Sequence, residues 1–589
     1  MGEPFEDSRR LTGANLYFDA PGAALETARG LAFDAAAVQR WRDNVTRLRT
    51  ALGWVDGACV ARMHRSGASL AFAAPIDQLY TAAEANEWAW YAALGMRADD
   101  SPVDGPDPAR PHVAHFDDAT ALQRLRALAK AEANPALVTL LEAARARGIP
   151  AHADDDALSI GEGEGAQAWA IDALPSVEAV PWARLHAIPK AVVTGSNGKT
   201  TSVRLLAALL QAHGLHCGYS STDGLVIAGA AIEPGDYSGP VGARTVLRHP
   251  RVQAAVLETA RGGLLRRGLV VRDARVALVT NVSADHFGEY GIHGLDDIAA
   301  VKLVVAKSLA PDGVLVLNAD DAMLVKHVPS SAPRVAWFAL ALEDALVQAG
   351  NAPACGVRAG RLYLHADGRE HDLGEVAGMP LTVAGSARYN IANIAGAALA
   401  AHALGIANAT IANVLAGFGR DARDNPGRLQ RWTLGDVEVL LDYAHNPDGL
   451  RGLLDVAQRL RRPGGRVALL LGQAGNREDA DIRALAGVAA AAKPDRVWLK
   501  DIGGDYLRGR TSGAVAHLLR DALREAGMTD EALPVCLDEA EAACAALAWA
   551  RAGDLLVLPV HEPERRSAVV AMLDRLQAGG WRAGQALPG

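Results

Sequence analysis

The stretch "TGSNGKTT", residues 194–201, follows the apolar run "AVV" and precedes the amphipathic segment "SVRLLAALLQAHG". This order predicts a β-strand, a glycine-rich turn and an α-helix, the unit that opens an α/β domain. In such a turn, backbone N–H groups and the helix N-terminus face phosphate oxygens. The stretch therefore predicts a phosphate-binding loop. It has the shorter GxxGKT form, because Val193 stands where the eight-residue pattern needs its first glycine.

This loop carries the groups that a nucleoside triphosphate and its magnesium ion require. Lys199 is the expected counter-charge for the phosphates, and Thr200 offers a hydroxyl to Mg²⁺. The residues expected to contact the nucleotide are Gly195, Ser196, Asn197, Gly198, Lys199, Thr200 and Thr201. An ordinary strand-to-helix turn is the alternative. The rarity of lysine in this arginine-rich chain favours the phosphate loop.

Two more apolar runs of the same region end in polar residues. Glu258 follows "AAVL", and Asn281, Asp285 and His286 follow "ARVALVT". The C-terminal ends of parallel strands meet at one edge of a sheet, so we expect these side chains near the phosphate loop. Glu258 and His286 are then candidate metal ligands. Taken singly, each is an ordinary loop residue, and only their order along the chain favours a site.

Length and patterning predict several domains. A chain of 589 residues, half of them apolar, has room for about three or four cores. Mixed strand-like and helical stretches predict an α+β N-terminal domain over 1–160, and the Asp-, Gly- and Pro-containing segment 161–187 predicts a linker. Repeated strand and helix patterns predict a central α/β ATP-binding domain over 188–425, with a parallel, doubly wound sheet. They also predict a Rossmann-like C-terminal domain over 426–589.

Charge and cysteine usage exclude several classes of function. The net charge is -9 and no basic tail is present, so neither nucleic acid nor an anionic membrane is an expected partner. The five cysteines are scattered without a CxxC pair, which argues against a disulfide framework and a zinc site. The N-terminus is charged and no apolar run reaches about 18 residues. These features predict a cytoplasmic protein that acts on small molecules or peptides.

The ordered motifs resemble those of the Mur ligase superfamily, ATP-dependent enzymes that form amide bonds. The matching stretches, over about 188–589, are "TGSNGKTT", "ETARGG", "TNVSADHFGEYG", "ARYNIANIAGA", "LDYAHNPDGL" and "GQAGNR". The resemblance implies a P-loop central domain and a reaction in which ATP converts a carboxylate to an acyl phosphate that an amine then attacks. It also implies ATP and Mg²⁺ as cofactors.

The same resemblance assigns roles to single residues. Lys199, Glu258, His286 and Lys302 match the catalytic set, and Thr200, Glu258 and His286 match metal ligands. Lys302 matches a lysine that is carbamylated in this superfamily, a modification that turns a cation into an anion. Asn390 matches an adenine contact, Arg428 a phosphate contact and Asp442 the nucleotide-facing edge of the last domain.

Within the superfamily, "GDYSGP", "VLETARGGLLRRGL" and "RGRTSG" resemble the Mur-like domain of cyanophycin synthetases, and "LTGANLYFDAPGAALE" resembles their N-terminal domain. Their intervening ATP-grasp domain has no counterpart in this chain. The resemblance implies addition of arginine to aspartate β-carboxylates of a polymer or peptide, by a homo-oligomer that works with a full cyanophycin synthetase. The candidate acceptor residues are Asp236, Ser238, Arg261, Arg508 and Arg510. A ligase for another peptide or small carboxylate, or a non-catalytic partner subunit, are the alternatives.

Overall fold

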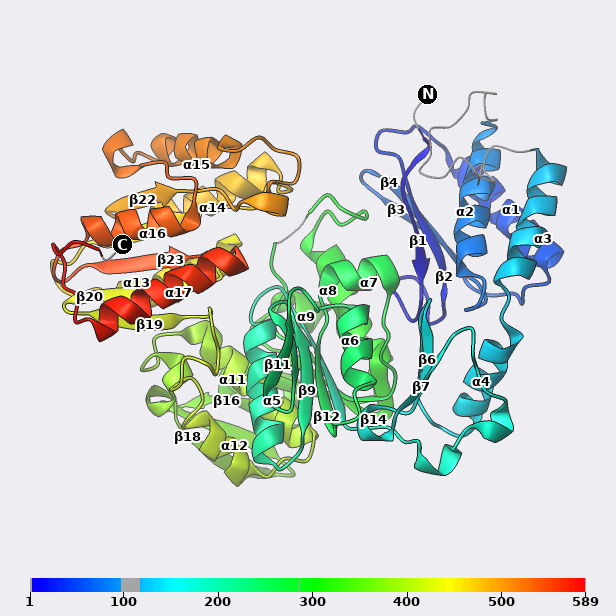
Figure 1. Ribbon diagram of the computed structural model, residues 1–589, viewed down its shortest axis with the longest axis horizontal. Helices are drawn as coiled ribbons and strands as arrows, with labels where there is room; N and C mark the ends of the chain where they lie inside the picture. Colours follow the sequence, from blue (N-terminus) through cyan, green and yellow to red (C-terminus); the bar gives the residue numbers. More distant parts are fainter. Residues whose placement is uncertain (1–2, 97–116, 285–286, 588–589) are drawn as a thin grey trace.

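Four β-sheets organise the chain in the computed structural model, which describes residues 3–96, 117–284 and 287–587. Figure 1 shows an N-terminal body in blue, a small cyan segment, a central body in green and a C-terminal body in yellow to red. Among the described residues, no helix has both the length and the apolar character needed to cross a membrane.

The N-terminal body is an antiparallel sheet covered by helices, with strand order β1-β2-β4-β3. The strands are β1 (Phe5–Leu11), β2 (Gly22–Thr27), β3 (Cys59–His64) and β4 (Gly67–Ala73). The helices are α1 (Ala35–Leu52), α2 (Leu79–Leu94) and α3 (Asp118–Glu132). Trp41, Phe72 and Trp90 are at most 1% exposed and lie in the core between sheet and helices. The α+β class predicted for this region is confirmed.

The segment 161–187, predicted as a linker, contributes one strand to a small sheet whose other two strands precede it. After α4 (Pro135–Ala146), a three-stranded antiparallel sheet forms from β5 (Ala151–Ala153), β6 (Ala157–Ile160) and β7 (Gln167–Ala170). Glu162 is buried and accepts a hydrogen bond from Lys190 Nζ at 2.6 Å, and His152 Nε2 lies 2.9 Å from its other oxygen. Because Lys190 begins the central sheet, this buried ion pair ties the small sheet to the central body.

The central body contains an eleven-stranded sheet of order β11-β10-β9-β12-β8-β13-β14-β15-β16-β17-β18. Its strands are β8 (Lys190–Thr194), β9 (Cys217–Ser221), β10 (Gly224–Ile227), β11 (Ala230–Pro234), β12 (Ala254–Glu258), β13 (Ala274–Val279), β14 (Leu309–Asn318), β15 (Val335–Ala341), β16 (Ala354–Arg358), β17 (Arg361–Ala366) and β18 (Arg369–Glu375). The seven central strands, in the order β9-β12-β8-β13-β14-β15-β16, pair in parallel, as predicted. The two strands at each edge pair antiparallel, because short hairpins connect them.

Helices cover both faces of this sheet (Figure 1). One face carries α5 (Lys199–Ala212), α11 (Arg388–Ala403) and α12 (Asn408–Leu415). The other carries α6 (Pro240–Leu247), α7 (Arg261–Arg267), α8 (Leu295–Leu303), α9 (Ala322–Lys326) and α10 (Leu342–Ala349). Strands buried on both faces read as continuous apolar runs, which is why the sequence revealed them.

The C-terminal body is a smaller α/β unit with strand order β19-β20-β23-β21-β22. The strands are β19 (Gln430–Leu434), β20 (Val437–Asp442), β21 (Val467–Leu471), β22 (Arg496–Leu499) and β23 (Leu555–Pro559). The helices are α13 (Pro447–Leu460), α14 (Asp479–Ala491), α15 (Ala514–Glu525), α16 (Glu539–Trp549) and α17 (Pro563–Ala578). All pairs except β19–β20 are parallel. The predicted Rossmann-like arrangement is confirmed.

The N-terminal sheet packs directly on the central body at α7. The backbone N–H of Thr12 donates to Arg267 O at 2.8 Å, and that of Leu269 donates to Ala14 O at 2.7 Å. The buried side chain of Arg9 adds a bond from Nε to Leu265 O at 2.8 Å. These bonds place β1 beside the helix that follows Glu258.

Candidate active site

The phosphate loop connects β8 to α5 and depends on two glycines. Gly195 has φ of +149° and Gly198 has φ of +83°, the region that favours glycine. A Cβ atom at Gly198 would lie 2.1 Å from Asn393 Oδ1 on α11. The hydroxyl of Thr280 donates to Asn197 O at 2.6 Å, and Asn197 N–H donates to Asn281 Oδ1 at 2.9 Å. The end of β13 therefore holds the loop in place.

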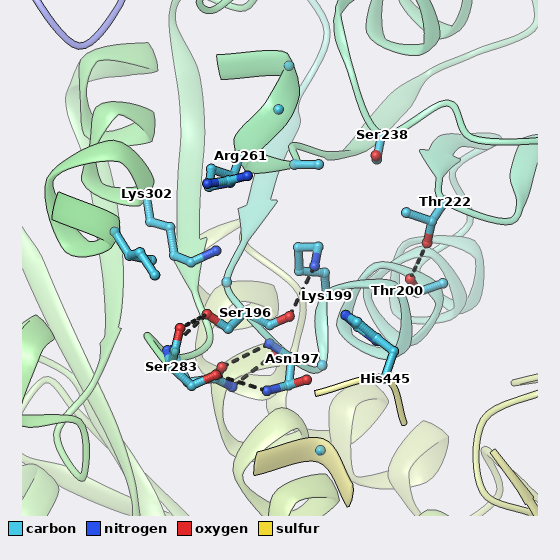
Figure 2. A pocket seen from close by; sticks show the side chains of 18 of the residues that line it. Ser196, Asn197, Lys199, Thr200, Thr222, Ser238, Arg261, Ser283, Lys302 and His445 are labelled. Atoms are coloured by element: carbon cyan, nitrogen blue, oxygen red, sulfur yellow. Dashed lines mark hydrogen bonds between the residues drawn. The ribbon is translucent and has the colours of Figure 1, made fainter. Parts of the chain in front are cut away.

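Lys199 lies at the first position of α5, where backbone N–H groups point away from the helix. Its Nζ donates to the Ser196 carbonyl of the same loop at 3.3 Å. Figure 2 shows the side chain above the loop, facing the cavity. The ammonium group is thus positioned to neutralise an anion held by the loop.

Three oxygen-bearing side chains gather beneath the first turn of α5. Thr200 Oγ1 donates to Glu258 Oε2 at 2.9 Å and lies 3.0 Å from Thr222 Oγ1. Glu258 is 1% exposed and forms no ion pair with any residue that the structure describes. Burial raises the pKa of its carboxyl above the ordinary value of 4.5. Hydroxyl and carboxylate oxygens are the ligands that Mg²⁺ prefers, so this set fits a magnesium ion.

Two of the sequence-predicted residues, Asp285 and His286, lie outside the described residues. Asn281 and Ser283, which precede them, both contact the phosphate loop: Asn281 Nδ2 donates to Asn197 O at 3.0 Å, and Ser283 N–H donates to Ser196 Oγ at 2.9 Å. Within the described ranges, no three His, Cys, Asp or Glu side chains cluster as a metal site. The role of His286 as a metal ligand stays a prediction.

Lys302 lies near the end of α8, is 4% exposed and lines the same cavity as the phosphate loop. Figure 2 shows its side chain extending from α8 into the space between Arg261 and Ser196. A lysine on an amphipathic helix would ordinarily lie at the surface. Its burial beside the loop agrees with the functional interpretation made from the sequence, and its carbamylation stays a prediction.

The remaining sequence-predicted nucleotide contacts also reach this cavity. Asn390 is 2% exposed, and its Nδ2 donates to Leu381 O at 3.0 Å. Asp442 ends β20, accepts a hydrogen bond from Leu429 N–H at 2.7 Å, and has its pKa raised by burial. Arg428 precedes β19 and stacks on the Tyr443 ring, 4.4 Å from its centroid. All three line the cavity.

One cavity of about 1500 Å³ is lined by the phosphate loop, Lys302, Asn390, Arg428 and Asp442. Residues from all three bodies line it, including Glu6, Asp7, Glu26 and Arg29 of the N-terminal sheet. Of the predicted acceptor residues, Asp236, Ser238, Arg261 and Arg508 line it as well. Arg510 instead holds a neighbouring loop, since its Nε donates to Gly475 O at 2.8 Å and its Nη2 pairs with Asp479 at 2.8 Å. The structure therefore gives Arg510 a supporting role.

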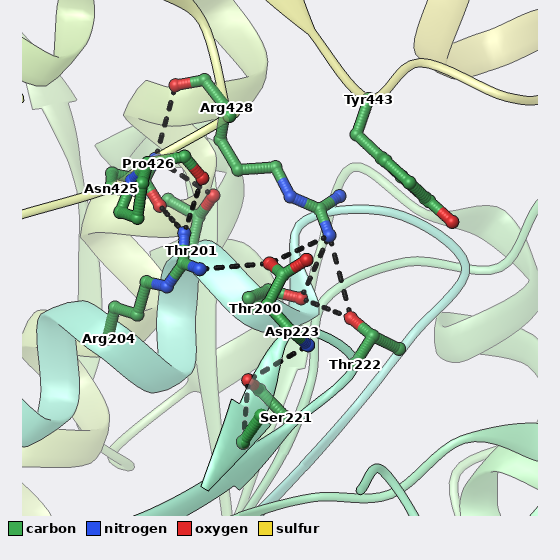
Figure 3. Close-up of polar contacts among 12 residues, drawn as sticks. Thr200, Thr201, Arg204, Ser221, Thr222, Asp223, Asn425, Pro426, Arg428 and Tyr443 are labelled. Carbon is green, nitrogen blue, oxygen red and sulfur yellow. Dashed lines mark hydrogen bonds and ion pairs between the residues drawn. The ribbon is translucent and has the colours of Figure 1, made fainter. Parts of the chain in front are cut away.

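Sequence reasoning missed Thr222 and Asp223, which directly follow β9, much as Glu258 ends β12. Asp223 accepts hydrogen bonds from Arg204 and Arg428 (Figure 3), and a third from Arg566. Burial alone would raise the pKa of Asp223, but these guanidinium groups lower it to about 2. The polar "STDG" after a strand was a usable signal, because it has the same strand-end position as the other site residues. Arg566 carries no such local signal.

Comparison with known protein families identifies two matching domains. The Mur ligase middle domain matches residues 193–401, and the Mur ligase glutamate ligase domain matches residues 427–559. A UDP-N-acetylmuramoyl-L-alanyl-D-glutamate--2,6-diaminopimelate ligase of Xanthomonas campestris pv. campestris is 30% identical over 397 residues, or 64% of this chain and 73% of the relative. The chain belongs to the Mur ligase family. Members of this family are ATP-dependent carbon–nitrogen ligases.

Other relatives are cyanophycin synthetases. The protein of Synechocystis sp. is 37% identical over 335 residues, which are 56% of this chain and 38% of that protein. The protein of Nostoc sp. is 37% identical over 378 residues, 63% of this chain and 41% of that protein. The chain thus spans about two fifths of the length of these relatives.

Among solved structures, E. coli FolC in complex with DHPP and ADP aligns with a TM-score of 0.48 and 19% identity, over 66% of this chain and 89% of FolC.

Proposed function

We propose that this chain is an ATP-dependent amide ligase that activates a carboxylate as an acyl phosphate and couples it to an amine. The supporting observation is one cavity that is lined by the phosphate loop and by charged residues of all three bodies. Thr200 and Thr222, the hydroxyl groups beside Glu258, line it as well. Transfer of a phosphoryl group needs charge neutralisation and positioning rather than a covalent side-chain intermediate. The residues of this cavity meet both needs.

The residues present fit ATP and Mg²⁺. A buried carboxylate without an ion pair, Glu258, is costly unless a cation joins it. Arg428 has a buried Nε–H group without a hydrogen-bond partner, which an anion would satisfy. Thr200, Glu258 and, by the family resemblance, His286 would hold the ion. Bound magnesium neutralises phosphate charge and orients the phosphate oxygens.

The chain's own side chains then divide the work. Lys199 and Arg428, which both line the cavity, neutralise and hold the phosphates. Asn390 and Asp442 face the base and sugar of the nucleotide, as the family resemblance implies. By the same resemblance, Lys302 is carbamylated, and the resulting carbamate would help to hold a metal ion. Lysine can accept this modification readily, whereas arginine cannot.

For the substrates, we infer arginine as the amine and an aspartate β-carboxylate of a polymer or peptide as the acyl group. The relatives named cyanophycin synthetase support this, as does a cavity lined by both acidic and basic side chains, which suits a ligand that bears both charges. Asp236, Ser238, Arg261 and Arg508 are the proposed contacts. A ligase for a different peptide is the second candidate, because the chain spans only about two fifths of those relatives.

For partners, we propose that this chain forms a homo-oligomer and works together with a full cyanophycin synthetase. Gel filtration of the purified chain, alone and mixed with such a synthetase, tests both parts. A monomer that never co-elutes with the synthetase would contradict them.

The catalytic proposal is tested by phosphate release from ATP. Amino acids are screened against poly-aspartate, β-aspartyl-arginine and aspartyl peptides, with wild type beside Lys199→Ala. We expect arginine-dependent release that falls about 100-fold or more in Lys199→Ala, the scale for loss of one preorganised charge contact. Lys326→Ala, at a half-exposed lysine of α9, is the matched control and should keep wild-type activity. No release with any pair, or equal release in Lys199→Ala, would overturn the proposal.

A further inference from the structure

Asp223 joins three arginines that come from distant parts of the chain, and Figure 3 shows two of them, Arg204 and Arg428. Arg204 belongs to α5 of the central body, Arg428 precedes the C-terminal sheet, and Arg566 belongs to α17. Arg204 also holds the connecting segment, since its Nη1 donates to Pro426 O at 2.9 Å and to Asn425 Oδ1 at 3.2 Å. Asp223 therefore lies where the central and C-terminal bodies meet.

The three arginines are bound unequally. Arg204 Nη2 and Arg566 Nη2 each lie 2.9 Å from a different oxygen of Asp223. Arg428 Nη2 lies 3.4 Å from the carboxylate, a distance at which a charge-assisted hydrogen bond is weak. Two strong donors thus occupy the carboxylate, one on each oxygen, and Arg428 is held loosely.

Arg428 also reaches the phosphate loop. Its Nη2 lies 3.4 Å from Thr200 Oγ1 and 3.5 Å from Thr222 Oγ1, both long contacts, and its buried Nε–H has no partner. Among the described residues, Asp223 is the only carboxylate that forms an ion pair with Arg204, Arg428 or Arg566. One carboxylate therefore forms ion pairs with three guanidinium groups. Arg428, which has the longest of these contacts, lines the cavity.

Gly427 leaves room for the side chain of Arg566, which passes close to its backbone. A Cβ atom at Gly427 would lie 2.9 Å from Arg566 Cδ, and Gly427 has φ of +72°. Arg566 is mostly buried, with 13% of its side chain exposed, although it does not itself line the cavity. Its contact with the site runs through Asp223.

We propose that Arg566 is a positioning residue that, together with Arg204, occupies Asp223 and so leaves Arg428 available to bind the phosphates of the nucleotide. Without Arg566, one oxygen of Asp223 loses its strong donor and draws Arg428 away from the phosphate loop. This inference rests on the proposed function in one respect, namely that the ligand is ATP.

The test is equilibrium binding of a non-hydrolysable ATP analogue with magnesium, which does not depend on the identity of the other substrates. Arg566→Ala should weaken binding about tenfold, the equivalent of one hydrogen bond to a charged group. Arg566→Lys keeps a cation near Asp223 and should bind more tightly than Arg566→Ala. Arg565→Ala is the matched control: Arg565 is its neighbour on α17, half-exposed and paired with Asp538 at 2.8 Å, and this variant should bind as wild type does.

The double variant Asp223→Asn/Arg566→Ala separates positioning from a structural role. It removes the charge that captures Arg428, so it should bind the analogue more tightly than Arg566→Ala does. A merely structural role predicts that the second substitution adds to the loss. Equal binding by Arg566→Ala and wild type, or weaker binding by the double variant than by Arg566→Ala, would overturn the inference. A wild-type protein that binds no nucleotide would instead overturn the proposed function.

Discussion

Two buried glutamates of the central region have opposite electrostatic surroundings. Glu162 is 2.6 Å from Lys190 Nζ, and although burial opposes ionisation, His152 and Lys190 lower its pKa. Glu258 has no ion pair in the described part of the chain, and burial raises its pKa. At neutral pH, the charged form of the same side chain therefore stabilises the folded protein at one position and destabilises it at the other.

We predict that Glu258→Gln raises the melting temperature of the ligand-free protein at neutral pH. A raised pKa in the folded state means that stability is lost as the pH rises through that pKa, and glutamine cannot ionise. Each unit by which the folded state raises this pKa costs about 1.4 kcal/mol of stability once the pH exceeds the raised pKa. Melting curves over a pH series measure the difference, which should close as the pH falls below the ordinary value of 4.5.

Glu162→Gln is the control of opposite sign. A lowered pKa gives stability that is present above the ordinary value of 4.5 and lost as the pH falls, so this variant should be less stable at neutral pH. Breaking a buried pair costs about 3–5 kcal/mol. A lower melting temperature for Glu258→Gln than for wild type at neutral pH would contradict the claim that ionised Glu258 destabilises the folded protein.

At the scale of elements, the phosphate loop is a strand, a turn and a helix whose close packing on α11 requires Gly198. The sequence predicted this unit because its signals are local: an apolar run, two glycines, and an amphipathic helix. The contact that makes the glycine necessary is with Asn393, which lies nearly two hundred residues away in sequence. That contact is decided by tertiary packing.

We predict that Gly198→Ala weakens binding of the ATP analogue at least about tenfold, because the new Cβ would meet Asn393 Oδ1 at 2.1 Å and displace the loop. Gly214→Ala, at the other end of α5, is the matched control. Gly214 also has a positive φ, +96°, but a Cβ atom at this position would have no other atom within 4 Å. Both variants lose about 1 kcal/mol of stability from backbone strain, and only Gly198→Ala should lose affinity. Equal affinities would contradict the role of the Asn393 contact.

At the scale of the whole molecule, the N-terminal sheet forms one wall of the cavity and is held to α7 by buried contacts. Arg9 is central to this interface: its Nη2 lies 2.7 Å from buried Glu26, and its Nε donates to Leu265 O. Its guanidinium also stacks on the Tyr290 ring, 4.6 Å from the centroid. The N-terminal body is thus packed against the segment that precedes α8 and Lys302.

We predict that Arg9→Met loosens this interface and costs about 3–5 kcal/mol, because Glu26 is left as a buried charge with fewer partners. Hydrogen exchange at the amides of Thr12 and Leu269, which bond across the interface, should become faster. Arg10→Met is the matched control. Arg10 pairs with the exposed side chain of Asp155, an interaction worth about 0–1 kcal/mol. Unchanged exchange in Arg9→Met would contradict a central role for Arg9.

The sequence by itself determined the phosphate loop, the parallel strands, the strand-end residues and the family resemblance. These depend on patterns within short stretches, where the apolar period and the glycine positions express backbone requirements directly. Glu258, Asn281 and Lys302 could be proposed because each follows or joins such a pattern. The antiparallel edge strands β10, β11, β17 and β18 were missed, because their short hairpins carry only weak patterns.

Only the tertiary structure decided which residues share the site. Asp223 and Arg566 are 343 residues apart, and their contact depends on how the C-terminal body packs on the central one. The same is true of Glu6 and Asp7, which line the cavity because β1 packs on α7. Ion pairs between distant segments have no periodic trace in a sequence, since one charged residue on a helix resembles any other until the fold supplies its partner.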